Sequence, residues 1–153
     1  MAESESNTPK LVADVLVIAE GQVLLVRYTD LRRYDGQPGW FLPDDMVAWG
    51  EHPSDTAKRI LLEQVELKLA EVPLSYIASF GTEGGGRWQL VFHHKVELEK
   101  LPSIRAAFNV REAIWFPLNA LPEAKTVAHE GWALGVIQEM TKEGHSAGDR
   151  SRS

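Results

Sequence analysis

Carboxylate side chains are concentrated in one stretch of the sequence, residues 44–63. Asp44 and Asp45 open the stretch after a Leu-Pro pair, and Glu63 closes it. Hard cations such as Mg²⁺ prefer oxygen ligands, and anionic ones most of all. A loop that folds Asp44 and Asp45 back over Glu63 would therefore create an oxygen cluster for a cation. The alternative is that both aspartates are ordinary turn residues, which bond their own backbone. This second interpretation is the one we expect.

An amphipathic helix is expected between the two ends of this stretch. Pro53 suits the first helical turn because that position has no backbone donor to lose, and Asp55 places a negative charge at the positive end of the helix. The spacing i, i+3, i+4 creates an apolar stripe of Ala57, Ile60 and Leu61. The stripe predicts that the helix buries Ile60 against the rest of the fold.

The same segment resembles the signature box of the Nudix family. That box reads Gly, five residues, Glu, seven residues, then Arg-Glu-U-x-Glu-Glu-x-Gly-U, where U is aliphatic. The positions that agree are Glu51, Arg59, Leu61, Glu63 and Leu67. The positions that differ are Asp45 and Glu66, which replace glycines, and Ile60 and Gln64, which replace glutamates. The framing pairs Leu42-Pro43 and Gly50-Glu51 are present, so the resemblance is stronger for the fold than for the active site.

The resemblance implies an α/β fold of the α/β/α sandwich type, with a mixed sheet flanked by helices. It also implies a pyrophosphohydrolase that cleaves a nucleoside diphosphate linked to another moiety, with Mg²⁺ or Mn²⁺ as cofactor. In the family, three glutamates on one helix face hold the cation. This chain keeps only Glu63, the candidate catalytic residue, because Ile60 offers no ligand and Gln64 only a neutral carbonyl.

Several side chains remain as candidate metal ligands or supports of the box. The candidate metal ligands are Glu63, Asp44, Asp45, Gln64 and Glu112, the last because the family often draws a further glutamate from the connection before its Trp-containing strand. Glu51 and Arg59 match the family's supporting pair, so we expect an ion pair that ties the loop to the helix. We expect this set to bind Mg²⁺ weakly and to support little or no hydrolysis.

Three classes of function are compatible with this pattern. The first is a domain that keeps the fold and a cleft, and binds a nucleotide-type or other phosphate ligand with little or no hydrolysis. The second is a working Mg²⁺-dependent pyrophosphohydrolase. The third is a protein-interaction domain without a small ligand. We rank them in that order, because most anionic ligands of the helix face are missing.

Arginine and tryptophan side chains near the box are candidates for ligand contact. A guanidinium group binds phosphate oxygens in a fork, and an aromatic ring stacks on a nucleobase. The candidates are Arg27, Arg32, Arg33 and Trp49. The alternative for the arginines is a solvated loop, which is the commoner case for surface charge.

Strands and a second helix are expected on either side of the box. Apolar and β-branched runs predict strands at 11–18, 22–28, 40–42, 74–80, 87–98 and within 112–122, and a final helix at 126–143. Turns at 20–21 and 81–86 predict two hairpins. We expect a disordered lead at 1–10, one domain at 11–142 and a flexible tail at 143–153. The adjacent His93 and His94 should point to opposite faces of their strand, so they cannot share a metal ion.

Composition limits the partners of the chain. Its 153 residues, with 44% hydrophobic content, suit one globular domain. The net charge of −6 argues against a nucleic acid polymer as the partner, because polyphosphate backbones are bound by basic surfaces. Cysteine is absent, which removes disulfides and thiolate chemistry. No apolar run reaches the roughly 20 residues that cross a bilayer, so we expect no membrane partner. We expect a cytoplasmic protein, a location with which the absence of cysteine is consistent.

Overall fold

The computed structural model describes residues 8–81 and 88–152, which form a mixed six-stranded sheet with helices. The strands are β1 (Lys10–Ala19), β2 (Gln22–Tyr28), β3 (Asp44–Met46), β4 (Leu74–Phe80), β5 (Gln89–Leu98) and β6 (Val110–Pro117). The helices are α2 (Pro53–Val65) and α3 (Ala128–Arg152), with short 3₁₀ turns η1 (Leu31–Tyr34) and η2 (Ala124–Thr126). The predicted alternation of strands and helices is confirmed.

The order of the strands is β4-β5-β1-β2-β6, and β3 pairs with β1 outside this path. Both expected hairpins are present, since β1 pairs antiparallel with β2 and β4 with β5. The turn between β1 and β2 places Glu20 and Gly21 at φ of 51° and 72° respectively, as a two-residue hairpin turn requires. The β1–β2 pairing covers only the pairs next to this turn, and the full length of β1 instead runs parallel to β5.

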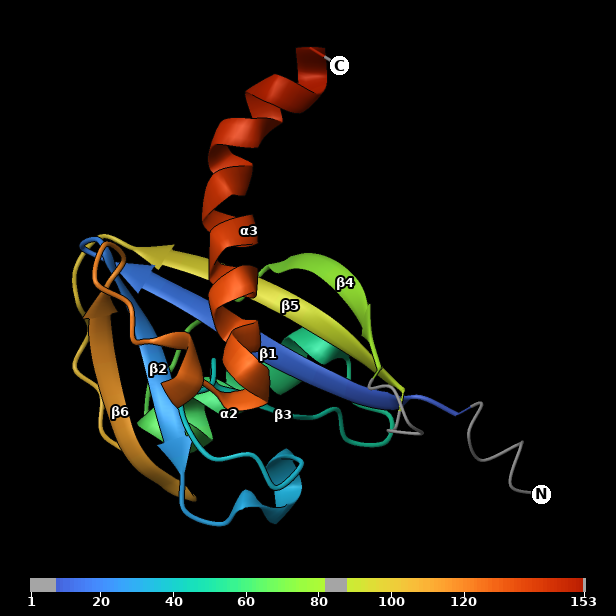
Figure 1. The fold of residues 1–153 in the computed structure, drawn as a ribbon. Helices are drawn as coiled ribbons and strands as arrows, with labels where there is room; N and C mark the ends of the chain where they lie inside the picture. The colour runs from blue at the N-terminus through green and yellow to red at the C-terminus, as the bar shows by residue number, and fades with distance from the viewer. Residues whose placement is uncertain (1–7, 82–87, 153) are drawn as a thin grey trace.

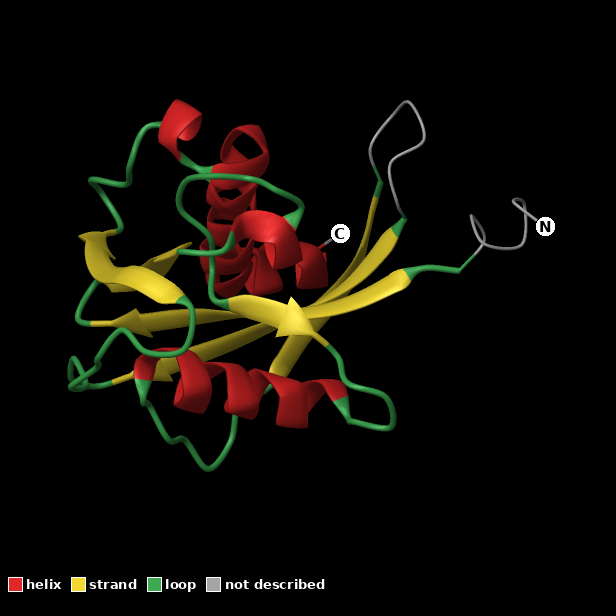
Figure 2. Ribbon diagram, turned by 90° about the horizontal axis from the view of Figure 1, so that it is seen from below, coloured by secondary structure: helices red, strands yellow, loops and turns green. Residues whose placement is uncertain are grey.

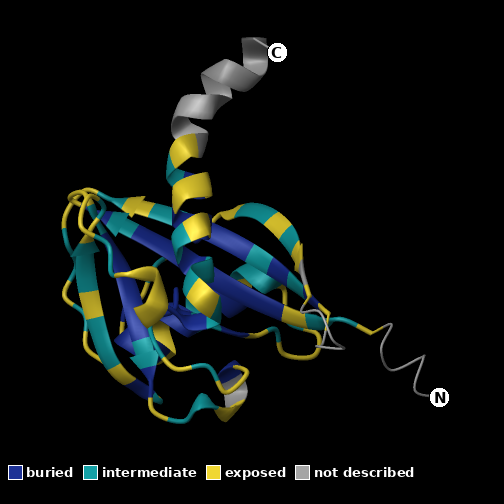
Figure 3. Ribbon diagram, viewed as in Figure 1, coloured by how far each residue is buried: buried dark blue, intermediate teal, exposed yellow. Residues whose placement is uncertain are grey.

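The two helices cover opposite faces of the sheet, as Figure 2 shows. Alternate residues of β1 serve the two sides, because successive side chains of a strand point to opposite faces. Val15 and Val17 pack with the α2 residues Ala57 and Leu61, whereas Leu16 packs with the α3 side. The centre of the sheet is therefore buried on both faces, which explains the apolar runs of β1 and β2 (Figure 3). The expected α/β/α sandwich is confirmed.

The two aspartates of the box are not turn residues, contrary to our expectation. They form strand β3, in which Asp44 lies opposite Asp14 and Asp45 opposite Ala13 of β1. A strand sends neighbouring side chains to opposite faces, so the side chains of Asp44 and Asp45 leave β3 in different directions. The 40–42 segment, in contrast, is no regular strand and makes only single bridges, from Phe41 to β2 and from Trp40 to Val127. The β-structure of the box therefore begins later than the sequence predicts.

Helix α3 differs from the expected 126–143 helix at both ends. At its start His129, Glu130 and Gly131 all have positive φ values, which produce a kink. At its end the helix continues to Arg152, where the sequence predicts a flexible tail (Figure 1). Within the residues that the structure describes, no helix is long and apolar enough to span a membrane. Of the expected lead 1–10, residues 1–7 lie outside the described part, and β1 already begins at Lys10.

Candidate ligand site

The loop before α2 is tied to the helix by Glu51 and Arg59. The Arg59 Nε and Nη2 atoms each donate to one carboxylate oxygen of Glu51, both at 2.9 Å. The same carboxylate accepts from the Thr56 hydroxyl at 2.7 Å and from the Ala48 backbone N–H at 3.0 Å. Arg59, above all, lowers the pKa of Glu51 to about 2. The structure thus contains the ion pair that the sequence predicts.

Arg59 also contacts the other acids beside α2. Its Nη1 lies 3.2 Å from Asp45 Oδ2 and 3.5 Å from Glu63 Oε1, and its Nη2 donates to the Met46 carbonyl at 3.0 Å. Asp45 is buried, whereas Glu63 is exposed. One guanidinium therefore contacts three carboxylates, although its single positive charge offsets only one of theirs. A metal ion placed among them would have to displace this cation or be repelled by it.

Gln64 occupies a box-glutamate position and is committed to internal hydrogen bonds. It is 1% exposed, accepts from the Tyr28 hydroxyl at 2.8 Å, and donates from Nε2 to the Asp44 carbonyl at 2.9 Å. The same hydroxyl accepts from the Asp44 backbone N–H at 3.0 Å. Burial raises the pKa of Tyr28 well above its usual range, so the hydroxyl stays protonated. Gln64, Tyr28 and Asp44 thus join α2, β2 and β3 without a cation.

The residues at the family's three glutamate positions do not fit the implied metal. Ile60 is fully buried, as the sequence predicts, and Gln64 has both ends of its amide bonded. Only Glu63 offers an exposed carboxylate, and Arg59 lies beside it. Across residues 8–81 and 88–152, no group of three or more His, Asp or Glu side chains is arranged to hold a metal ion. Glu63 alone is a weak site for a hard cation.

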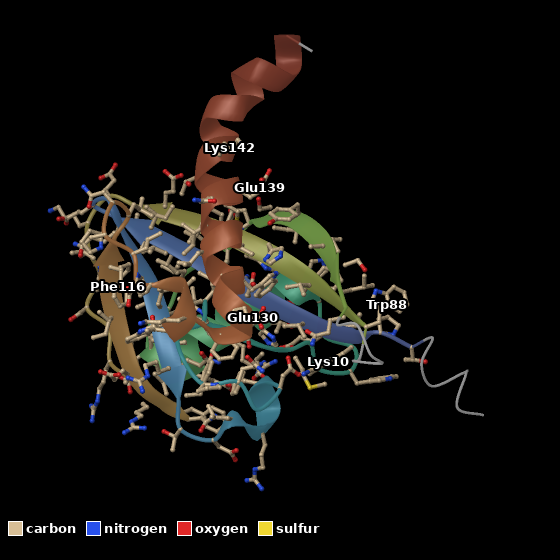
Figure 4. The ribbon with its side chains drawn as sticks, viewed as in Figure 1. Lys10, Trp88, Phe116, Glu130, Glu139 and Lys142 are labelled. Carbon is tan, nitrogen blue, oxygen red and sulfur yellow. The ribbon has the colours of Figure 1, made fainter. Side chains whose placement is uncertain are left out.

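A pocket lies on the other face of the sheet, between β1, β3, β5, η1 and the start of α3. Val12 and Val91 contribute apolar side chains to its lining, and Tyr34 and Trp132 contribute aromatic rings. Its polar side chains include Lys10, shown at the start of β1 in Figure 4. Sequence analysis missed this pocket because its residues come from five segments that only the fold brings together.

Asp35 contacts three other side chains that line this pocket. Lys10 Nζ lies 3.4 Å from its Oδ1, while Gln89 Nε2 donates to its Oδ2 at 3.2 Å. His129 Nε2 lies 3.2 Å from the same Oδ2. The bond to His129 is the main cause that lowers the pKa of Asp35, so this carboxylate stays ionised. Asp35 therefore connects η1 with β1, β5 and α3, and no local sequence signal indicates these partners.

Asp44 lines the pocket, and its neighbour Asp45 is the residue that pairs with Arg59. Burial, followed by the carboxylates of Asp14 and Asp45, raises the pKa of Asp44 well above its usual range. Asp14, its cross-strand neighbour, places Oδ1 2.8 Å from Nδ1 of His93, and both side chains are 1% exposed. Asp14 Oδ2 and His93 Nε2 have no hydrogen-bond partner among the described residues.

His93 and His94 point to opposite faces, as predicted. His93 contacts the rings of Tyr76 and Trp132 on the α3 side. His94 places Nε2 3.4 Å from the Ser54 hydroxyl at the start of α2, and its Nδ1 lies 2.8 Å from the Phe92 carbonyl. Burial lowers the pKa of His94, so this imidazole is neutral. The two histidines serve separate parts of the core.

The remaining candidate residues do not converge with Glu63. Arg27 pairs with Glu112 at 2.8 Å and lies over the Trp40 ring, which places both on the α3 side of the sheet. Arg32 pairs with Asp30 at 2.7 Å and is otherwise exposed. The side chain of Arg33 lies outside the described part of the structure. Trp49 is fully exposed at the tip of the box loop.

Comparison with known proteins gives the family. The family model of the NUDIX domain matches residues 8–134, which is most of the chain. The chain therefore belongs to the Nudix family. A search of the curated proteins finds no match.

Solved structures share the fold at low sequence identity. The MutT NUDIX hydrolase from Burkholderia pseudomallei superimposes with a TM-score of 0.69 and 18% identity, covering 84% of this chain and 96% of that one. The NUDIX domain of Shewanella oneidensis NrtR, solved with ADP ribose, gives 0.65 and 15%, covering 92% and 97%. A C. elegans Ap4A hydrolase binary complex gives 0.64 and 14%, covering 88% and 98%. At these identities the likeness concerns the fold alone.

Proposed function

We propose that this chain is a Nudix-fold binding domain that takes a nucleotide-type or other phosphate ligand and carries out little or no hydrolysis. The observation that carries the proposal is the closed network of Gln64. A box glutamate in that position would present a carboxylate to a cation, whereas Gln64 donates to the Asp44 carbonyl and accepts from Tyr28. Both polar atoms of the Gln64 side chain thus have hydrogen-bond partners within the protein and need no metal ion.

The cluster around Arg59 supports the same conclusion. Hydrolysis of a diphosphate linkage in this family depends on divalent cations that offset the charge of the phosphates. Here the acids beside α2 are hydrogen-bonded to Arg59, and Ile60 removes another ligand from the helix face. The chain thereby keeps the fold and a pocket, but supplies few ligands for the cation. The NrtR domain, whose structure holds ADP ribose, is a precedent for ligand binding on this fold.

Isothermal titration with ADP ribose and a panel of nucleoside diphosphate sugars tests the proposal. We expect at least one of these ligands to bind, with the same affinity in EDTA and in MgCl₂. Chromatography of the mixtures after long incubation should show no product above the level without protein. Failure of every phosphate ligand to bind would overturn the binding function.

The enzyme remains the second candidate because Glu63 is exposed and only loosely paired, 3.5 Å from Arg59. It predicts Mg²⁺-dependent product formation that Glu63→Gln abolishes. Leu62→Gln, on the neighbouring exposed position of α2, is the matched control and should retain any turnover. Robust turnover with this pattern would make the chain a pyrophosphohydrolase and would refute the first proposal.

A further inference from the structure

A strip of the sheet on the α2 side has no covering element among the described residues. Leu11 faces this side, because it has the same parity along β1 as Val15, which packs with α2. The strand register places Leu90 of β5 beside Leu11, and Phe92 of β5 beside Ile77 of β4. These residues and a neighbouring tryptophan form one surface, which we call the β4–β5 patch: Leu11, Ile77, Trp88, Leu90 and Phe92.

The side chains of the β4–β5 patch are exposed rather than packed. Ile77 is 52% exposed, Leu11 40% and Trp88 39%, and much of β4 is open to solvent in Figure 3. Trp88 lies on this face because its Nε1 donates at 2.8 Å to the hydroxyl of Ser79, opposite Leu90. The two members from β5 are half-buried, and neither packs against the two hydrophobic clusters of the described chain. An uncovered group of adjacent apolar side chains marks an interaction surface.

The strands that carry the patch are free of charge. Residues 74–80 and 88–94 contain no Asp, Glu, Lys or Arg, although the whole chain has a net charge of −6. Edge strands are commonly protected by charged residues or proline, and the other edge strand, β6, contains Arg111, Glu112 and Pro117. The edge strand β4 has none of these. Two copies of an acidic chain can therefore approach each other here without bringing like charges together.

Trp49 provides a side chain that the patch of a second copy can receive. It is fully exposed at the tip of the box loop. This loop starts beside the patch, because the Val47 N–H donates to the Leu11 carbonyl at 3.0 Å. Glu51 holds the loop in place through the Ala48 N–H. The molecule thus has a projecting aromatic ring and an uncovered apolar face next to each other, as a self-complementary contact requires.

We propose that the β4–β5 patch is the contact surface between two copies of this chain, in a two-fold dimer in which Trp49 of each copy packs on the patch of the other. In such a dimer every contact occurs twice, so both Trp49 rings become buried. The patch and Trp49 offer several hundred Å² per copy, near the about 800 Å² that each partner buries in a standard interface. Tryptophan is also the residue type most often found where binding energy is concentrated.

Sedimentation velocity of the full chain, from about 1 μM to about 500 μM, tests the proposal. We expect a concentration-dependent shift from the mass of one chain to the mass of two. Trp49→Ser and Ile77→Lys should each raise the dimer Kd at least about thirtyfold, because each removes a central apolar contact. Phe108→Ser is the matched control and should keep the Kd, since Phe108 is 53% exposed but lies just before β6, at the opposite edge of the sheet.

The remaining outcomes overturn the proposal. The mass of one chain at every concentration would show that the patch does not join two copies. A dimer that persists in folded Trp49→Ser and Ile77→Lys would place the contact elsewhere. These two substitutions lie on different elements, the box loop and β4, so either one tests the patch if the other variant fails to fold. Flotation with phosphatidylcholine vesicles tests another occupant, and a monomer that binds them, but not as Ile77→Lys, would assign the patch to a lipid surface instead.

Discussion

Gln64 donates its side-chain amide to the backbone carbonyl of Asp44, across the junction of α2 and β3. A glutamine supplies the N–H donor that this bond needs. An ionised glutamate at position 64 would instead place a carboxylate oxygen against the Asp44 carbonyl oxygen, and both are acceptors. A glutamine at position 64 therefore allows α2 and β3 to be joined by a hydrogen bond, with no cation between them. This relationship makes the replacement of Gln64 the most direct experiment on the site.

Gln64→Glu should destabilise the fold at neutral pH by about 3 kcal/mol, because a buried carboxylate would face the Asp44 carbonyl without a donor. Burial raises the pKa of such a carboxyl, and its protonated form can donate, so the deficit should shrink as the pH falls. Urea unfolding at two pH values measures both effects. Gln138→Glu, on the exposed side of α3, is the control. Equal midpoints for the two variants would contradict the proposed role of Gln64.

The double change Ile60→Glu with Gln64→Glu restores the family's three carboxylates around Glu63. Without metal it should lower the Tm strongly, because Ile60 is fully buried and a charge there has no partner. Added MgCl₂ should recover part of the loss by binding only the folded form. Thermal unfolding in MgCl₂ and in EDTA is the measurement, and the unmodified chain should show no difference between them. Leu62→Glu, which adds an exposed carboxylate to α2, should gain nothing from Mg²⁺.

Arg59→Ala should lower the free energy of unfolding by about 3 kcal/mol, since it leaves the buried Asp45 carboxylate without its cation. Lys58→Ala is the matched control on the same helix, because Lys58 pairs only at the surface, 3.7 Å from Asp55. Denaturant unfolding of both variants provides the comparison. A loss as small as that of Lys58→Ala would show that Arg59 does not hold the loop.

The pH dependence of this effect has a definite sign. Arg59 lowers the pKa of Glu51 to about 2, below its unfolded value of about 4.3. The contribution to stability is therefore complete above pH ~4.3 and is lost as the pH falls toward 2. The difference in Tm between the unmodified chain and Arg59→Ala should narrow through this window. A constant difference from pH 6 to pH 2 would contradict the assignment.

Gly39→Ala should destabilise the loop before the box far more than Gly36→Ala. Both glycines have positive φ, 102° for Gly39 and 68° for Gly36, but they differ in their surroundings. A Cβ at Gly39 would lie 2.5 Å from the Thr126 carbonyl oxygen, whereas at Gly36 it meets nothing within 4 Å. We expect about 1 kcal/mol for Gly36→Ala and about 3 kcal/mol for Gly39→Ala. Similar unfolding midpoints would mean that the close approach of residues 39 and 126 can relax.

Local patterns predicted the parts of the molecule that depend on neighbours in the sequence. The stripe around Ile60 and the spacing of Glu51 and Arg59 follow from helix geometry, and the structure shows both the buried face and the ion pair. The fold class followed from the order of apolar runs and the resemblance of the box. The buried stripe and the ion pair depend only on α2 and the loop directly before it.

The pocket could not be predicted, because it depends on register between distant strands. Asp44 looked like a turn residue until the pairing with Asp14 placed it in a strand. Asp35 looked like part of an Asp-Gly turn, and its partners Lys10, Gln89 and His129 are spread over most of the chain. A single sequence carries no signal for such contacts.

The parallel pairing of β1 with β5 also determines when the sheet can form. Residues 10–19 find their long partner at 89–98, and they pair with β2 only beside the turn. A strand pair so far apart in sequence carries a large loop-closure cost and forms slowly. During synthesis, β1 therefore cannot complete its pairing with β5 until residue 98 has been made. The centre of the sheet can thus form only after five of its six strands have been made, and β6 at residues 110–117 is added to its edge.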